Sequence, residues 1–226
     1  MRFGGVVVGV FVLSLCACTS CHPERAPLVP GRSPVYSSVV LIHAQYGDQG
    51  KAGIGTGFFI DEHVLVTAGH VLDVFMLEQV TRRRIGYVAG DSVAELVDIP
   101  DFRFIRHPIY DLALIVLPDV KPHAVTRLCE QYPGPGQSVH AVGFPGGKLS
   151  EAYGVVLSDY PSDMIFYNMV VIPGFSGGPI EFVGHRCVAG ITFAAVEIGD
   201  RTYTYGVETS LLLDMLHQIL DGSSTP

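Results

Sequence analysis

From residue 35 onward, the hydrophobic residues of this chain fall into short runs separated by turn-forming residues. Runs such as "SSVVLIHA", "IGTGFFI", "HVLVTA", "LALIVL" and "TYTYGVET" are rich in β-branched and aromatic residues, and Gly, Pro, Asp or Asn stand between them. This spacing predicts β-strands joined by turns. Helical periodicity is clear only in "SLLLDMLHQIL", where Ser210 is a candidate N-cap, while "GHVLDVFMLEQV" is long enough for one or two helical turns. The sequence therefore predicts an all-β fold that ends in a C-terminal helix over residues 210–220.

The stretch "LPDVKPHAV", residues 117–125, follows the most apolar strand and contains two prolines, so we interpret it as a linker between two halves. Each half has about six candidate strands, which is enough to close a small barrel. We therefore predict two six-stranded antiparallel β-barrels, an N-terminal one over about residues 35–118 and a C-terminal one over about 125–208. The glycines of "GIGTGF" do not have the spacing of a phosphate-binding loop, and we expect them to allow bends in a barrel strand.

The first 34 residues have a different character. Residues 1–20 combine one basic residue, an apolar stretch and small residues near cysteines, which is the layout of an export signal and is short for a membrane span. The tetrad that ends at Cys18 also resembles a bacterial lipobox, so plain signal cleavage and lipidation of Cys18 both stay open. Residues 21–34 contain four prolines and are interpreted as an extended tether. We expect an exported protein, secreted, periplasmic or held at the envelope. If it is attached to a membrane, the attachment is expected only through a lipidated Cys18.

Composition excludes several classes of partner. The formal net charge is −8, and the only short basic run is Arg82-Arg83-Arg84, which we interpret as a solvated loop or edge strand, so no nucleic acid is expected. Neither CxxC nor HExxH occurs after residue 34, so neither a metal nor another cofactor is predicted. Cys129 and Cys187 remain in the folded part, and a disulfide between them and two free thiols both stay open.

Three polar residues lie in distinctive surroundings. "VTAGH" places His70 after an apolar strand, "YDLAL" places Asp111 before a buried strand, and "GFSGGP" surrounds Ser176 with glycines. Each alone has an ordinary structural explanation, as a core histidine, a turn aspartate and a Gly-Ser turn. Together they contain the three groups of nucleophilic catalysis, because a serine hydroxyl needs a base to accept its proton and the base needs an orienting acid.

The strings "TAGHV", "YDLAL" and "GFSGGPI", in this order, resemble the trypsin-like (chymotrypsin-fold) serine protease family over about residues 35–220. The resemblance implies a peptidase domain over residues 35–222 that cleaves polypeptide substrates. It also implies that Ser176 is the nucleophile, His70 the general base and Asp111 the group that orients the imidazole. The backbone N–H groups of Gly174 and Ser176 would form the oxyanion hole.

One departure from the family pattern and one further similarity refine this expectation. Phe175 stands where many members have Asp or Asn, so activation by a new N-terminal ammonium is not expected, and the ring of Phe175 would either support the oxyanion loop or distort it. The string "YGVETSLLLDML" is similar to the closing strand and helix of HtrA-like bacterial proteases. Few residues follow position 220, so we expect no PDZ domain there.

The resemblance also implies a substrate-binding region. Val170, six residues before Ser176, would lie at the base of the S1 pocket, and Phe193, Ala194 and Ala195 would form one wall. None of these residues carries a charge, so an apolar P1 residue of small or medium size is expected.

Three alternatives accompany this interpretation. "GFSGG" also satisfies the G-x-S-x-G pattern of α/β-hydrolases, but that fold needs alternating helices, and its Asp and His follow the serine. A catalytically inactive relative that binds peptides or a partner protein would keep the fold without the reaction. An esterase would use the same three residues.

Overall fold

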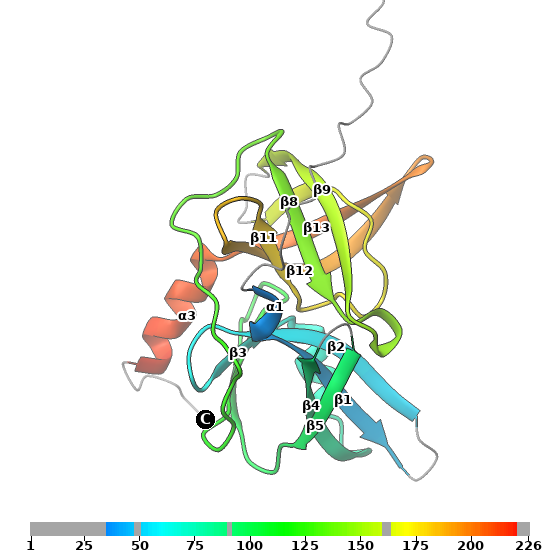
Figure 1. Ribbon diagram of the computed structural model, residues 1–226, viewed down its shortest axis with the longest axis vertical. Coiled ribbons are helices and arrows are strands. Elements are labelled where there is room, and N and C mark those ends of the chain that lie inside the picture. Colours follow the sequence, from blue (N-terminus) through cyan, green and yellow to red (C-terminus); the bar gives the residue numbers. More distant parts are fainter. Residues whose placement is uncertain (1–34, 48–50, 90–91, 160–163, 221–226) are drawn as a thin grey trace, which may run out of the picture.

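The computed structural model describes residues 35–47, 51–89, 92–159 and 164–220. The predicted leader over residues 1–20, the tether over 21–34 and the candidate lipidation site Cys18 all lie outside the described residues. The described part of the chain forms two β-structures, which lie one above the other in Figure 1.

Among the described residues, the N-terminal half contains two short helices and seven strands. They are α1 (Val35–Ser38), β1 (Val39–Tyr46), β2 (Lys51–Phe59), β3 (Val64–Thr67), α2 (Gly69–Phe75), β4 (Val80–Ala89), β5 (Ser92–Asp98), β6 (Arg103–Arg106) and β7 (Ala113–Val116). The C-terminal half, over the residues that the structure describes, contains six strands, one 3-10 turn and one helix. They are β8 (Ser138–Gly143), η1 (Pro145–Gly147), β9 (Ser150–Asp159), β10 (Met164–Asn168), β11 (Pro179–Phe182), β12 (Cys187–Ile198), β13 (Arg201–Glu208) and α3 (Ser210–Leu220).

The C-terminal half is a closed antiparallel barrel with the strand order β10-β13-β12-β11-β8-β9. Its interior is filled by apolar side chains that alternate along the strands, as in β10, where Ile165 and Tyr167 are buried and their neighbours are partly exposed. The prediction of a six-stranded barrel is confirmed for this half.

The N-terminal half corrects the prediction, because it is an open seven-stranded sheet with the order β5-β4-β1-β2-β3-β7-β6. The additional strand is β5, whose acidic residues and mostly exposed side chains hide its periodicity in the sequence. The edge strands β5 and β6 are not paired with each other. Between them, Pro100 has no N–H to donate, the N–H of Ile99 bonds to the carbonyl of Arg83 on β4, and β6 has only four residues. These features leave the sheet open at that edge.

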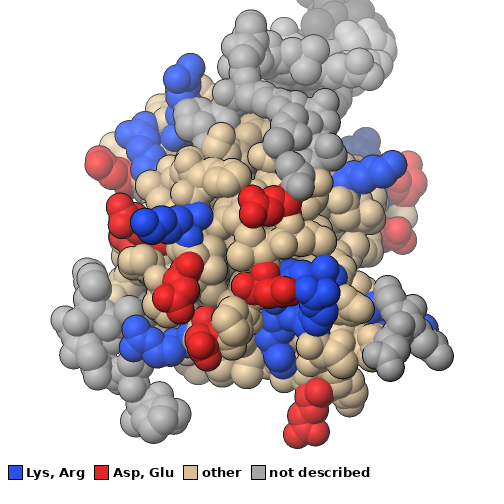
Figure 2. All heavy atoms as spheres, turned by 60° about the horizontal axis from the view of Figure 1, so that its bottom comes forward, with Lys and Arg blue, Asp and Glu red and all other residues tan. Residues whose placement is uncertain are grey.

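The basic triplet also differs from its prediction. Arg82, Arg83 and Arg84 lie in β4, which is paired on both sides, with β1 and β5, so they occupy neither a loop nor an edge strand. Their charged ends reach local acceptors, among them Asp98, which lies 2.6 Å from Arg82. On the face shown in Figure 2, acidic and basic side chains lie beside one another and do not form a continuous patch of one sign.

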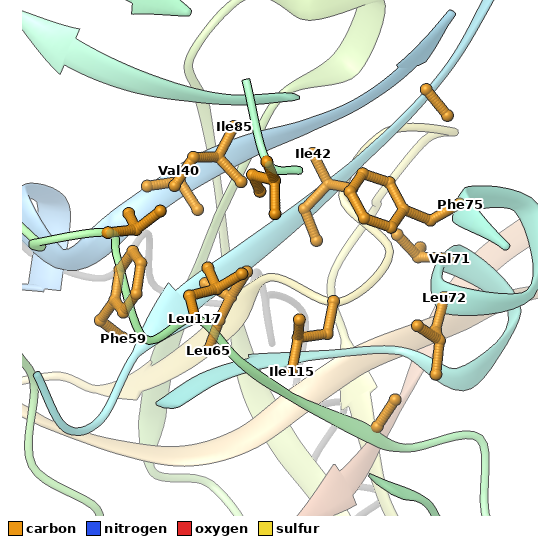
Figure 3. Close-up of a cluster of buried hydrophobic side chains, with 14 of the residues drawn as sticks. Val40, Ile42, Phe59, Leu65, Val71, Leu72, Phe75, Ile85, Ile115 and Leu117 are labelled. Atoms are coloured by element: carbon orange, nitrogen blue, oxygen red, sulfur yellow. The ribbon is translucent and has the colours of Figure 1, made fainter. Parts of the chain in front are cut away.

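Helix α2 is held against the N-terminal sheet by its apolar face. Figure 3 shows Val71, Leu72 and Phe75 of this helix pointing into a cluster that includes Ile42 of β1 and Ile115 of β7. The three helix side chains are almost fully buried, so α2 is fixed relative to the sheet. Its seven residues confirm the prediction of one or two helical turns after the strand.

Helix α3 has the predicted bounds, Ser210–Leu220. Its Leu212 and Met215 are buried in a second cluster, which also contains Phe58 and Leu114 from the N-terminal half and Val207 from the barrel. The two halves therefore share apolar packing, and the space between them is fixed. None of the helices in the described ranges is long and apolar enough to cross a membrane.

A disulfide joins Cys129, in the connection between the halves, to Cys187 at the start of β12. Its Cα atoms are 5.0 Å apart, and the N–H of Cys129 donates to the carbonyl of Val188 while the N–H of Val188 donates to the carbonyl of Arg127. Of the two alternatives for these cysteines, the structure contains the bridge, which ties the connecting segment to the barrel.

Reduction of this disulfide is expected to lower the free energy of unfolding by about 4 kcal/mol, because the bond closes a loop of 58 residues in the unfolded chain. Urea unfolding of the protein with and without dithiothreitol measures the difference, and the variant Cys129→Ala/Cys187→Ala serves as a control that does not respond to the reductant. A loss below about 1 kcal/mol on reduction would show that the bond does not constrain the unfolded chain as described.

Candidate active site

His70 and Asp111 are brought together from different elements of the N-terminal half. His70 is the second residue of α2, and Asp111 ends the turn that leads into β7. The Nδ1 atom of His70 lies 2.5 Å from Oδ2 of Asp111, and the backbone N–H of His70 donates to Oδ1 at 2.7 Å. Because both carboxylate oxygens bind the same residue, the imidazole is fixed in position and in tautomer. The proton of the neutral ring lies on Nδ1, and Nε2 keeps its lone pair.

The pKa of Asp111 is set by opposing effects. Burial raises it, but the hydrogen bonds and charge of His70 and the nearby charge of Arg106 lower it more strongly, so the pKa lies below its usual value. Asp111 is therefore ionised at neutral pH and accepts both bonds from His70.

The turn before Asp111 is shaped by His107, which the sequence analysis did not identify. Its ring Nδ1 accepts hydrogen bonds from the backbone N–H groups of Ile109 at 3.2 Å and Tyr110 at 3.0 Å. The backbone N–H of His107 donates to the carbonyl of Leu112 at 2.9 Å. These bonds fix the backbone on both sides of Asp111. A histidine four residues before a candidate acid gives no signal in the sequence, because its partners are backbone atoms.

Ser176 follows a tight turn made by residues 172–175. Pro173 and Gly174 occupy the two central positions, Gly174 has φ of 110°, and the N–H of Phe175 donates to the carbonyl of Ile172 at 3.2 Å. Proline followed by a glycine with positive φ is the signature of a type II turn, in which the peptide between them is rotated by half a turn relative to type I. The direction of the Gly174 N–H therefore depends on the φ value that glycine permits.

Thr56 of β2 holds the carbonyl groups of this loop. Its hydroxyl donates to the carbonyl of Gly174 at 2.6 Å, and its N–H donates to the carbonyl of Ser176 at 2.9 Å. Within the described part of the chain, the N–H groups of Gly174 and Ser176 donate to no acceptor. The loop thus keeps two backbone donors unused beside the serine. Thr56 is a second residue that the sequence analysis missed, although it lies in the "IGTGF" string.

Close packing explains why the loop is rich in glycine. A Cβ on Gly174 would stand 2.5 Å from the carbonyl oxygen of Phe144, and one on Gly177 would stand 2.2 Å from the carbonyl oxygen of Thr56. Phe175 is 4% exposed, and its ring packs into the barrel core next to Gly143. The ring therefore points inward and supports the loop, which answers the question that the sequence left open.

Two cavities border His70 and Ser176, and both residues line both of them. One has a volume of about 390 Å³ and is otherwise lined by the loop before Ser176 and by β12. The other has a volume of about 410 Å³ and is otherwise lined by β1, β2, α2 and the same loop. In the described part of the chain no hydrogen bond joins Ser176 Oγ to His70. Both side chains nevertheless open onto the same space, and such contacts are often long when no substrate is bound.

Three of the four predicted substrate-binding residues line the smaller cavity, namely Phe193, Ala194 and Ala195. Val170 does not. It is 61% exposed, and Val171, which is buried, lines the cavity instead, together with Ile172 and Pro173. The alternation of β10 continues past its end, so Met169 and Val171 are buried and Val170 between them is exposed. Among the described residues, no three His, Cys, Asp or Glu side chains cluster as metal ligands would.

Comparison with known proteins agrees with this geometry. Residues 55–189 match the family of trypsin-like peptidase domains. No curated protein matches the sequence. Among solved structures, the chain is similar to the serine endoprotease from Yersinia pestis, with 17% sequence identity and a TM-score of 0.64 over 84% of this chain and 65% of that one. It is also similar to the HtrA-type protease AlgW with a tripeptide, with 16% identity and a TM-score of 0.66 over 84% of this chain and 62% of that one.

At these identities the similarity to solved structures shows a shared fold, the chymotrypsin-like one. The chain spans slightly less than two thirds of the length of those two proteases. The family match covers more than half of the chain and includes His70, Asp111 and Ser176. The resemblance drawn from the sequence is therefore confirmed, and the chain belongs to the family of trypsin-like peptidase domains.

Proposed function

We propose that the protein is a serine endopeptidase that hydrolyses peptide bonds through an acyl-enzyme. The observation that carries the proposal is the pair of bonds between His70 and Asp111 beside two cavities that Ser176 shares with His70. An ionised carboxylate that fixes the imidazole, with Nε2 left as a base, is the arrangement that activates a serine hydroxyl.

In the proposed reaction, Ser176 Oγ attacks the carbonyl carbon of the scissile peptide while His70 Nε2 accepts the hydroxyl proton. The resulting imidazolium, stabilised by Asp111, gives that proton to the leaving amine as the C–N bond breaks. Water then attacks the serine ester, His70 takes a proton from the water, and the proton returns to Ser176 Oγ as the carboxylic product leaves. Atoms and charge balance over the two halves of the cycle.

The oxyanion of each tetrahedral intermediate would bind the N–H groups of Gly174 and Ser176. Both are without an acceptor among the described residues, and Thr56 holds the neighbouring carbonyl groups away from them. Donors that are already fixed need no reorganisation when charge develops on the substrate, which is why such groups accelerate acyl transfer.

The cavity of about 390 Å³ would hold the P1 side chain. Its walls are mainly apolar, with Val171, Ile172 and Pro173 on one side and Phe193, Ala194 and Ala195 on the other. A charged P1 residue would lose hydration there without gaining a partner, so an apolar residue of small or medium size is proposed. A peptide library in which Lys or Arg dominates at P1 would contradict this assignment.

Export is also part of the proposal. The leader pattern of residues 1–20 supports it, as does the disulfide between Cys129 and Cys187, because structural disulfides persist mainly in oxidising compartments. Plain signal cleavage and lipidation of Cys18 lead to different products, which palmitate labelling of the wild type and Cys18→Ala separates.

Hydrolysis of an unfolded protein substrate tests the reaction, with the variants Ser176→Ala and His70→Ala beside the wild type. We expect cleavage by the wild type, and a loss in each variant of at least about 10³-fold in kcat. Equal rates in the wild type and Ser176→Ala would reject the reaction. Peptide binding without cleavage would then favour an inactive relative, while cleavage of ester substrates alone would favour an esterase.

A further inference from the structure

Arg106, at the end of β6, makes hydrogen bonds through all three nitrogen atoms of its guanidinium. Its Nε lies 2.9 Å from Oδ1 of Asp73, its Nη2 donates to Oδ2 of Asp73 at 3.1 Å, and its Nη1 donates to the carbonyl of His107 at 3.2 Å. Asp73 belongs to α2, the helix that carries His70. One planar guanidinium therefore connects the His70 helix to the turn that precedes Asp111.

The same guanidinium lies close to the carboxylate of Asp111. A Cβ on Gly69 would stand 2.9 Å from Oδ1 of Asp111 and 3.1 Å from both Cζ and Nη2 of Arg106. The Asp111 carboxylate and the Arg106 guanidinium thus both lie next to Gly69, the residue immediately before His70. A side chain at this position would displace one or both of these groups. Oδ1 of Asp111 is also the oxygen that accepts the N–H of His70.

The charges around Asp111 are few. His70 on α2 and Arg106 on β6 favour its ionised form, while Asp73 on α2 neutralises part of the charge of Arg106, and His107 packs in the turn. The ion pair with Asp73 is half-exposed, and ion pairs at such positions contribute little to stability. Loss of Arg106 should therefore leave the protein folded.

We propose that Arg106 is a positioning residue, which joins helix α2 to the turn before Asp111 and holds its positive charge beside the carboxylate that binds His70. The role rests on the proposed function of the His70–Asp111 pair. Arg106 would act on the reaction only through these residues, since it does not line either cavity beside Ser176.

Four variants separate charge from anchoring. Arg106→Gln removes both, Arg106→Lys keeps the charge but loses the planar fork, and Asp73→Asn keeps the charge of Arg106 while weakening its anchor. Arg82→Gln is the matched control, because Arg82 forms a similar half-exposed pair with Asp98 in a different part of the sheet.

The first measurement is kcat/KM for peptide hydrolysis as a function of pH. For Arg106→Gln we expect kcat/KM to fall about tenfold at neutral pH, mainly through kcat, and the acidic limb of the profile to move to higher pH, because a positive charge beside the triad is lost. Arg106→Lys should keep the position of that limb. Asp73→Asn should move it to lower pH, because a negative charge is lost. Arg82→Gln should match the wild type.

The second measurement does not require activity. The carboxyl ¹³C resonance of Asp111, assigned with Asp111→Asn, should titrate at higher pH in Arg106→Gln than in the wild type and Arg82→Gln. The proposal is overturned when both the pH profile and this titration are the same in Arg106→Gln and Arg82→Gln. If the wild type cleaves no peptide, the proposed function fails while the titration still decides the effect of Arg106 on Asp111. If Arg106→Gln does not fold, Asp73→Asn and Arg106→Lys decide the question: the acidic limb should lie at lower pH in Asp73→Asn than in Arg106→Lys, and the same limb in both would overturn the proposal.

Discussion

Replacing Asp111 with Asn is expected to lower kcat for peptide hydrolysis about 10⁴-fold with little change in KM. The carboxylate accepts two hydrogen bonds from His70, one from the backbone N–H at 2.7 Å and one from Nδ1 at 2.5 Å. Asn has one oxygen and one NH₂ group. If its oxygen accepts the backbone N–H, its NH₂ group must face Nδ1, which then becomes an acceptor, and the ring proton moves to Nε2. A ring protonated at Nε2 has no lone pair for the proton of Ser176.

The control for this prediction is Asp98→Asn, which alters a carboxylate that also accepts two bonds but from a surface arginine, Arg82. Unfolding in urea should show that both variants are folded, so that the difference in kcat reports on the chemistry. A decrease below about tenfold in Asp111→Asn would mean that the tautomer of His70 does not limit the reaction.

The second large effect is expected at Gly174. Gly174→Ala should lower kcat by about 10² to 10³-fold, because its N–H is one of the two proposed donors to the oxyanion. The added Cβ would stand 2.5 Å from the carbonyl oxygen of Phe144, and the φ of 110° is unfavourable for any residue with a Cβ. The turn must rotate to relieve both, and the donor then leaves its position.

Gly184→Ala is a matched control, because Gly184 also has a positive φ, 86°, but a Cβ there would meet no atom within 4 Å. The variant Gly184→Ala therefore introduces the strain of a positive φ but no clash beside Ser176. Steady-state kinetics of the two variants should therefore differ by two orders of magnitude or more in kcat. Equal kcat values in Gly174→Ala and Gly184→Ala would contradict the assignment of the Gly174 N–H.

Much of the fold could be predicted because its signals are local. The short apolar runs between turn residues indicated an all-β chain, and the leucine periodicity of α3 gave its bounds, Ser210–Leu220. Strand β5 was not visible, because an exposed edge strand needs no apolar face. The open edge of the N-terminal sheet also depends on a single backbone bond from Ile99 and on Pro100, which no periodicity reveals.

In the candidate site too, residues with a local sequence signal could be predicted, and residues that depend on tertiary contacts could not. His70, Asp111 and Ser176 lie in strings whose order is distinctive, so they could be named from the sequence. Thr56 and Arg106 could not be, because their partners are reached only through the pairing of strands and the docking of α2. Val170 was predicted at the cavity by counting back from Ser176, whereas the alternation that continues from β10 buries Val171 in the cavity wall and exposes Val170.

Reaction with a fluorophosphonate, followed by mass spectrometry of the digested protein, tests the central claim most directly. A hydroxyl activated by His70 and Asp111 should give one adduct, on Ser176, and the rate of labelling should fall sharply in His70→Ala and vanish in Ser176→Ala. Labelling of the wild type no faster than that of Ser176→Ala, or an adduct on a different residue, would contradict it.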